Sequence, residues 1–279
     1  MRELAPDLLY CFVMSRNCKF QGNTARSVRL LTFFVTVLIA MSFPGCKSHN
    51  ARGSSPLGAA VPILLFNGDG TSPNDVLAIE SILFNAHLDY STANSAQLNA
   101  MSETQLRQYR LLIVPGGNFI DMGKSLTTAT SLNIHNAVKE GLNYFGICAG
   151  GFLAGQSAYY NSFKLAPGKQ FGFYSAANKN IQKAAVPIIT PGGNVLEQYW
   201  ENGPQFQGWG DVIGKYPDGT PAITEGTCGH GWVILAGIHA EAPEEWRNGM
   251  IFRTSADTDN AYALKIINAA LDRISLPHY

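Results

Sequence analysis

The feature that most constrains this chain is a cysteine placed directly between an apolar run and a string of small residues. Residues 142–147, LNYFGI, have the composition of a buried strand, and Cys148 follows at once, before Ala149, Gly150 and Gly151. The pattern Gly146-x-Cys148-x-Gly150 has the form of a nucleophile elbow, a sharp turn from strand to helix. The residues two before and two after the nucleophile come close together there, so a side chain at either would clash. The sequence therefore predicts Cys148 in a strained conformation with positive φ, at a turn into a helix.

Apolar runs alternate with helical patterns on both sides of this turn, which predicts an α/β domain with a largely parallel sheet. The run at 61–66 is continuously apolar, as a strand buried on both faces is, and further strands are predicted at 110–117 and 232–238. Ser72 is placed to cap a helix, with Pro73 at its first position and Asp75 three residues after the cap. A helix with Ile134, Ala137 and Val138 on its inner face is expected to end at Gly141, and further helices are expected over 149–160 and 262–274. The stretch 160–228 is rich in Gly, Pro, Asn and aromatic residues and is predicted to form antiparallel strands and loops.

Composition supports one folded domain. The chain is 46% hydrophobic and 11% aromatic, which suffices for a sizeable core, and only 14% charged, against roughly 25% in typical soluble domains. Residues 1–45 carry five Lys/Arg and two Asp/Glu, so the remainder has 15 basic and 18 acidic residues. This balance predicts no nucleic-acid partner.

The N-terminus has the pattern of an export signal. Residues 30–41 form an uncharged run of 12 after Arg26 and Arg29, too short to span a bilayer but typical of a signal-peptide core. Gly45-Cys46 resembles a bacterial lipobox, in which the chain is cut before a cysteine that carries a lipid, although Phe43 and Pro44 depart from the usual residues.

These patterns predict three segments: an N-terminal extension and signal peptide over 1–45, a flexible tether over 46–60, and the folded domain over 61–279. Lipidation at Cys46 would attach the protein to the cell envelope through a membrane anchor. Lys47, in place of the aspartate that commonly retains lipoproteins at the inner membrane, favours the outer membrane or its periplasmic face. A soluble secreted protein and an uncleaved N-terminal anchor are the alternatives.

Two further segments carry groups that suit a cysteine nucleophile. His239 and Glu241 follow the strand predicted at 232–238, and residues two apart in an extended segment point to the same side. His239 is therefore the candidate base and Glu241 the group that orients it. Backbone N–H groups of Gly117 and Asn118, together with that of Ala149, are candidates for an oxyanion hole.

In this order, the strand ending in Pro-Gly-Gly, Gly146-Ile-Cys-Ala-Gly-Gly and Gly237-Ile-His-Ala-Glu resemble the class I glutamine amidotransferase superfamily. Phe66-Asn67-Gly68 and the segment from Tyr199 through Asn202 to Pro204 further resemble the N-terminal domain of eukaryotic biotin-protein ligases and free-standing bacterial proteins related to it. The resemblance covers about residues 61–274.

The resemblance implies a flavodoxin-like, doubly wound sheet with helices on both faces and a Cys148–His239–Glu241 triad. It also implies elbow glycines at Gly146 and Gly150. Four residues in the similar segments are candidates for substrate binding, namely Asn67, Gly68, Tyr199 and Asn202. The family's usual His-Pro-Glu reads His-Ala-Glu here. No Gly-Arg-Gly-Arg type adenylate loop is present, so biotin transfer is not expected.

Other candidate residues have ordinary explanations. Cys228 is predicted to be structural, in a hairpin before the last strand, and no second Cys/His pair accompanies His230, so no metal is expected. The turn at 67–72 could bind an anion or be a plain βα turn. The aromatic residues could line a pocket or pack the core; they are Phe171, Phe173, Tyr174, Tyr199 and Trp200.

Two function classes follow from these residues. The first is a thiol-dependent hydrolase or amidase that acts without a cofactor, through a thioester, on an unknown small-molecule or peptide amide or ester. The second is a catalytically silent envelope protein that binds a ligand in the same cleft. The sequence leaves the substrate and the oligomeric state open.

Overall fold

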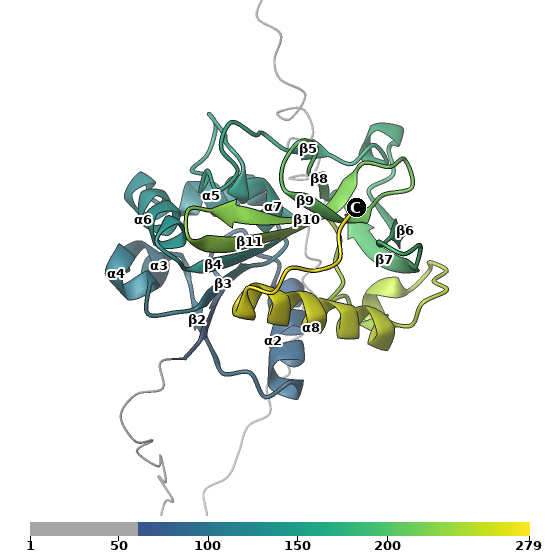
Figure 1. Ribbon diagram of the computed structural model, residues 1–279, viewed down its shortest axis with the longest axis horizontal. Coiled ribbons are helices and arrows are strands. Elements are labelled where there is room, and N and C mark those ends of the chain that lie inside the picture. Colours follow the sequence, from purple (N-terminus) through teal and green to yellow (C-terminus); the bar gives the residue numbers. More distant parts are fainter. Residues whose placement is uncertain (1–60) are drawn as a thin grey trace, which may run out of the picture. The chain divides into compact units, whose positions relative to one another are not determined.

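A parallel half-sheet forms the centre of the domain, which a computed structural model describes over residues 61–279 (Figure 1). The predicted signal peptide, the tether and Cys46 lie outside the described residues. Five strands run parallel in the order β2-β1-β3-β4-β11, which is the flavodoxin-like order. They are β1 (Ile63–Phe66), β2 (Tyr90–Ala93), β3 (Leu111–Val114), β4 (Asn143–Ile147) and β11 (Gly231–Ala236).

The second half of the sheet is antiparallel, as predicted for residues 160–228. Four strands extend it beyond β11 in the order β10-β9-β6-β7. They are β10 (Pro221–Cys228), β9 (Asp211–Lys215), β6 (Lys183–Ile189) and β7 (Val195–Glu201). The short strands β5 (Gly172–Phe173) and β8 (Pro204–Gln205) pair separately.

Helices cover both faces of the sheet, which confirms the predicted fold class (Figure 1). Apolar residues of α2 (Pro73–Asn85) and α8 (Ala256–Asp272) share one buried cluster with Ile63, Leu111 and Ile234 of the sheet. The other face packs against the remaining helices. These are α3 (Ser95–Ala100), α4 (Glu103–Leu106), α5 (Phe119–Ser125), α6 (Thr128–Lys139) and α7 (Ala149–Ala154); two short 3₁₀ helices are η1 (Ala177–Lys179) and η2 (Glu244–Arg247).

Two predicted helix boundaries were wrong. The helix after Cys148 ends at Ala154 rather than near residue 160, because the carbonyls of Leu153 and Ala154 accept N–H groups of Phe163 and Ala166. The chain folds back on the helix there and cannot continue it. The last helix begins at Ala256 rather than near 262, because the Ser255 side chain accepts the Thr258 N–H as an N-cap.

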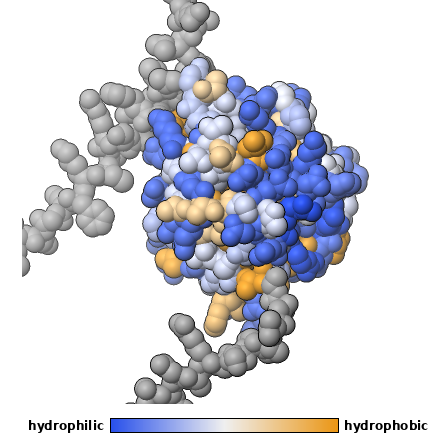
Figure 2. Space-filling view, turned by 90° about the vertical axis from the view of Figure 1, so that its left-hand side faces the viewer, coloured by the Kyte–Doolittle hydropathy of each residue, from blue (hydrophilic) through white to orange (hydrophobic). Residues whose placement is uncertain are grey.

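The register of the parallel strands brings the predicted chemical groups to one edge of the sheet. Val114 pairs with Gly146, and Ala236 pairs with Ile147, so Cys148 and the segments after β3 and β11 leave the sheet at the same level. The face of the domain in Figure 2 is largely hydrophilic, with apolar residues scattered over it. Among residues 61–279, no helix combines the length and apolarity needed to cross a bilayer.

Candidate active site

Cys148 occupies a strained turn between β4 and α7. Its backbone has φ 47° and ψ −100°, a conformation that costs free energy in a residue with a side chain. The surroundings enforce it: Cys148 N–H donates to Ala236 O at 2.7 Å. A Cβ on Gly146 would lie 2.6 Å from Gly150 O, and one on Gly150 would lie 2.1 Å from Val114 O. The two glycines are therefore required for the turn to close.

The Cys148 thiol lies against the end of β7. It is in the reduced form, as is that of Cys228, and its Sγ donates to Glu201 O at 3.6 Å. Cys148 is only 6% exposed, so its thiol is largely buried.

His239 and Glu241, which the sequence paired, do lie together beyond the end of β11. The Nδ1 atom of His239 is 2.9 Å from Glu241 Oε1, and both residues are buried. The backbone of His239 donates to Tyr199 O at 2.8 Å, which ties this loop to β7. The rings of Tyr199 and Trp246 pack edge-on against the imidazole, with centroids 5.8 and 5.9 Å away. The imidazole is therefore fixed on several sides.

Sequence reasoning missed a second carboxylate at His239. Asp75, in the first turn of α2, places its Oδ1 2.9 Å from His239 Nδ1. It is 5% exposed. The sequence placed this residue correctly at a helix start, but a carboxylate in a first turn ordinarily serves the helix itself. Its contact with a histidine more than 160 positions later is a tertiary feature.

The charges of this cluster favour a protonated histidine. Burial by itself lowers the pKa of His239, but the charges of Asp75, Glu241 and Cys148 oppose it and set that pKa well above its usual value. Burial raises the pKa of Asp75, yet the charge of the adjacent His239 outweighs it and leaves that pKa lowered. Burial keeps the pKa of Glu241 raised. Asp75 is therefore the carboxylate that stays ionised most readily.

Of the predicted oxyanion donors, Asn118 already donates its backbone N–H within the protein. The N–H of Asn118 donates to Gly70 O at 2.8 Å, and its side chain accepts the Ile120 and Asp121 N–H groups as the cap of α5. Gly117 has φ 139°, and a Cβ there would lie 2.2 Å from Gly70 O. The backbone geometry thus commits Asn118 to the turn and leaves Gly117 and Ala149 as candidates.

Two of the four candidate substrate-binding residues are close in the chain to Glu201, whose carbonyl accepts from Cys148 Sγ. Tyr199 Oη donates to Glu201 Oε2 at 2.6 Å, and Asn202 follows Glu201 in the chain with φ 45°. Asn202 is 7% exposed, and neither atom of its amide has a hydrogen-bond partner among the described residues. A buried amide without partners is costly, so this group is available for a ligand.

The other two candidates belong to the turn after β1, which is held by its own hydrogen bonds. Thr71 Oγ1 donates to Gly68 O at 2.7 Å, and Asp69 N–H donates to Ser95 Oγ at 2.9 Å. Asn67 is exposed and donates its N–H to Ala93 O. The interactions found here are those of a plain βα turn.

The remaining aromatic candidates pack within the core. Trp200 is fully buried, and Tyr174 stacks on Tyr216 at 3.8 Å between centroids. Phe171 packs edge-on against Phe206 at 5.0 Å. Phe173 is partly buried and packs against both clusters of the core.

Cys228 ends β10 in the predicted hairpin, paired with Gly231. Burial raises the pKa of its thiol, which the charge of Lys139 only partly offsets.

Within residues 61–279, ligand atoms of Asp75, His239 and Glu241 lie within 4.8 Å of one another, a spacing that could hold a metal ion. The hydrogen bond between His239 Nδ1 and Glu241 Oε1 explains the short distance between these two residues without a metal ion.

A pocket of about 290 Å³ opens beside this cluster. Its lining includes Asp75, Tyr199, Glu201 and Trp246, together with the charged residues Lys183 and Glu245. Asp75 contacts His239, and the Glu201 carbonyl accepts from Cys148 Sγ. The pocket is therefore lined by aromatic and polar residues that contact the two predicted catalytic residues.

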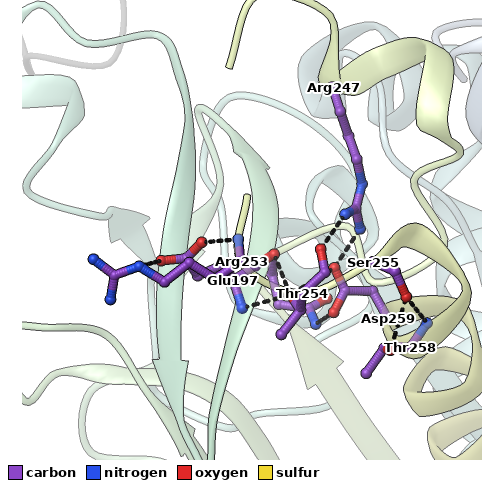
Figure 3. A network of polar contacts seen from close by, with 8 residues as sticks. Glu197, Arg247, Arg253, Thr254, Ser255, Thr258 and Asp259 are labelled. Atoms are coloured by element: carbon purple, nitrogen blue, oxygen red, sulfur yellow. Dashed lines mark hydrogen bonds and ion pairs between the residues drawn. The ribbon is translucent and has the colours of Figure 1, made fainter. Parts of the chain in front are cut away.

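The loop that carries Trp246 is anchored by a polar network (Figure 3). Arg247 pairs with Asp259 of α8 and donates to Thr254 O at 2.7 Å. Gln198 Nε2 of β7 donates to Asp259 Oδ1 at 2.7 Å. Glu197 ties the same loop to β7 through its contacts with Arg253. Arg247 and Asp259 are both buried.

The strand order and the strained cysteine at the end of β4 define a flavodoxin-like α/β domain with an elbow turn. The model of the family described as "Biotin-protein ligase, N terminal" matches residues 61–174. This match confirms the resemblance stated from the sequence for that part of the chain. The Tyr199–Pro204 segment, His239 and Glu241 lie beyond it. A comparison with curated proteins found no match.

Solved structures show only distant likeness. A glutamine amidotransferase from Thermotoga maritima is 11% identical with a TM-score of 0.49, covering 77% of this chain and 98% of that one. A putative GMP synthase component from Thermoplasma acidophilum is 11% identical with a TM-score of 0.48, covering 76% and 96%. An exo-β-1,4-mannosidase from an Opitutaceae bacterium is 12% identical with a TM-score of 0.45, and 76% of this chain spans 36% of that protein.

Proposed function

We propose that this protein is a thiol-dependent hydrolase or amidase with Cys148 as nucleophile, His239 as base and Glu241 as the group that orients His239. The observation that carries the proposal is the strained φ of 47° at Cys148, which two glycines make possible at the edge of the sheet where His239 is also buried. Strain of this kind persists where surrounding structure enforces it and is concentrated at reactive sites.

The reaction follows from these groups. The Cys148 thiolate attacks a substrate carbonyl, forming an S–C bond, while the carbonyl electrons move to oxygen. The N–H groups of Gly117 and Ala149 are the proposed donors to that oxyanion. Its collapse expels the amine or alcohol, which takes a proton from His239. Water then attacks the thioester, losing a proton to His239, and the acid and the thiolate are released.

The unpartnered amide of Asn202 supports a substrate that carries an amide. Its N–H donors and carbonyl acceptor are both buried and unpaired among the described residues. A substrate amide presents the matching acceptor and donor, so binding would satisfy both sets of groups at once. We therefore place the acyl group of a small amide or peptide between Asn202 and the elbow.

The test is acylation by 4-nitrophenyl acetate, a small activated ester that many thiol sites accept. The full-length protein is expected to release nitrophenolate in a burst of about one equivalent and to gain one acetyl group on Cys148. Cys148→Ser should remove both, whereas Cys228→Ser should keep both. Without acylation of Cys148 in the folded protein, the alternative of a silent binding protein would replace this proposal.

We further propose that the domain is exported and attached to a membrane of the cell envelope through lipid on Cys46, which lies outside the described residues. The support is the sequence alone, with its arginine-flanked run and Gly45-Cys46 junction. A small-molecule or peptide substrate would then be met outside the cytoplasm.

Lipidation gives a direct prediction. When the full chain is expressed in a bacterium with labelled palmitate, label should enter the protein and disappear in Cys46→Ala. Cys18→Ala, which alters a cysteine outside the junction, should label like the parent. Labelling that survives Cys46→Ala would contradict the proposed anchor.

A further inference from the structure

His239 is flanked by two buried carboxylates, and only one of them accepts its hydrogen bond. Glu241 Oε1 and Asp75 Oδ1 each lie 2.9 Å from His239 Nδ1. The N–H is directed at Glu241, so Asp75 Oδ1 has no hydrogen-bond partner among residues 61–279. Leaving a buried carboxylate oxygen unbonded is costly unless a charge compensates for it. Asp75 therefore acts on His239 through charge.

Contacts at the start of α2 hold Asp75 beside the ring. The Asp75 N–H donates to the Ser72 cap at 3.3 Å, and Ser72 N–H donates to Gly116 O at 3.0 Å, which ties the start of α2 to the end of β3. A Cβ on Gly116 would lie 2.3 Å from Asp75 Oδ1 and 2.6 Å from His239 Cε1. Only a residue without a side chain at this position leaves room for the carboxylate beside the ring.

We propose, on the basis of the function proposed above, that Asp75 is a positioning residue that keeps His239 in its imidazolium form opposite Cys148. Glu241 sets the orientation of the ring, and Asp75 supplies the fixed negative charge. An imidazolium beside a cysteine favours the thiolate, which is the attacking form of the nucleophile.

The other groups that face the ring do not replace this charge. Glu241, on the loop after β11, has a raised pKa because it is buried. Tyr199 of β7 stays neutral, since burial and Glu201 raise its pKa far above its usual value. Cys148, at the β4–α7 turn, is the partner whose ionisation is in question. Asp75 of α2 has the lowered pKa in this set.

The test is the pH profile of Cys148 alkylation by iodoacetamide, resolved by peptide mass spectrometry on the full-length protein. An opposite charge this close changes the pKa of its neighbour by about 1–3. Asp75→Asn should therefore slow Cys148 by about tenfold or more near pH 6.5 and move the inflection upward, with the rates converging at high pH. Asp257→Asn is the matched control, because Asp257 lies exposed in the first turn of α8; it should leave the profile unchanged.

A double variant separates positioning from a merely structural role. If Asp75 acts through His239, the double variant Asp75→Asn with His239→Gln should alkylate Cys148 at the same rate as His239→Gln alone. Should Asp75→Asn fail to fold, Asp75→Ser, which keeps a residue suited to a helix start, takes its place in the same assay.

The outcomes distinguish the two proposals. A wild-type profile in Asp75→Asn, together with slowing by His239→Gln, would overturn the role of Asp75 and leave the proposed function standing. No slowing in either variant would overturn both. A metal ion held by the parent protein and lost from Asp75→Asn would also overturn the role, because the carboxylate would then be a ligand.

Discussion

Iodoacetamide is expected to modify Cys148 faster than Cys228 near neutral pH, and His239→Ala is expected to abolish most of that difference. A thiol of ordinary acidity is only a few per cent ionised at pH 7, so pairing with an imidazolium can raise the reactive fraction about thirtyfold. Burial raises the pKa of Cys228, which slows its reaction further. The measurement is the rate at each cysteine in the same sample.

The expected loss in His239→Ala is about tenfold or more at Cys148, with no change at Cys228, which serves as the internal control. His230→Ala is the matched variant, since His230 is an exposed histidine on the hairpin beside Cys228. Equal rates at the two thiols in the parent protein would reduce the elbow to a relic of the fold. The binding-protein alternative would then be preferred.

Arg247→Met is expected to lower the free energy of unfolding by about 3–5 kcal/mol, the usual cost of leaving one partner of a buried ion pair uncompensated. Arg247 and Asp259 are 4% and 1% exposed, and their contact joins the Trp246 loop to α8 (Figure 3). Urea unfolding of the full-length protein measures the change. Arg253→Met is the control, because Arg253 is exposed and its ion pair with Glu197 should be worth at most about 1 kcal/mol.

The pH dependence of this loss has a definite sign. Burial, which the charge of Arg247 only partly opposes, raises the pKa of Asp259 to about 6. A carboxyl whose pKa is higher in the folded protein contributes stability at low pH, and that contribution is lost as the pH rises through about 6. The deficit of Arg247→Met should therefore be larger at neutral pH than near pH 4, where Asp259 is protonated.

A double replacement tests whether charge is the cause. Arg247→Met combined with Asp259→Leu removes both charges and should recover most of the stability, because an apolar pair of similar volume is often as stable as a buried ion pair. A double variant no more stable than Arg247→Met would point to lost packing instead. Weaker anchoring of the loop should also loosen Trp246 against His239, since the two rings are in contact.

The sequence by itself determined the elbow, because its cause is local. Gly146 and Gly150 surround Cys148 at the spacing where any side chain would clash, so the turn could be predicted from residue types alone. Strand patterns predicted four of the five parallel strands, because burial on both faces demands apolar runs. The edge strand β2, Tyr90–Ala93, was not predicted, because it is only partly buried and has no apolar run. The pairing of His239 with Glu241 follows from positions two apart.

Only the tertiary structure decided which other groups complete the site. Asp75 lies far from His239 in sequence, and its role depends on a buried distance of 2.9 Å that no local pattern encodes. The commitment of Asn118 N–H to Gly70 O depends on how two loops meet. Ionisation states depend on burial and on neighbouring charges, which exist only once the chain has folded. Steric requirements of a turn depend on adjacent residues and can be recognised from the sequence. The electrostatics of the site depends on residues that only the fold brings together.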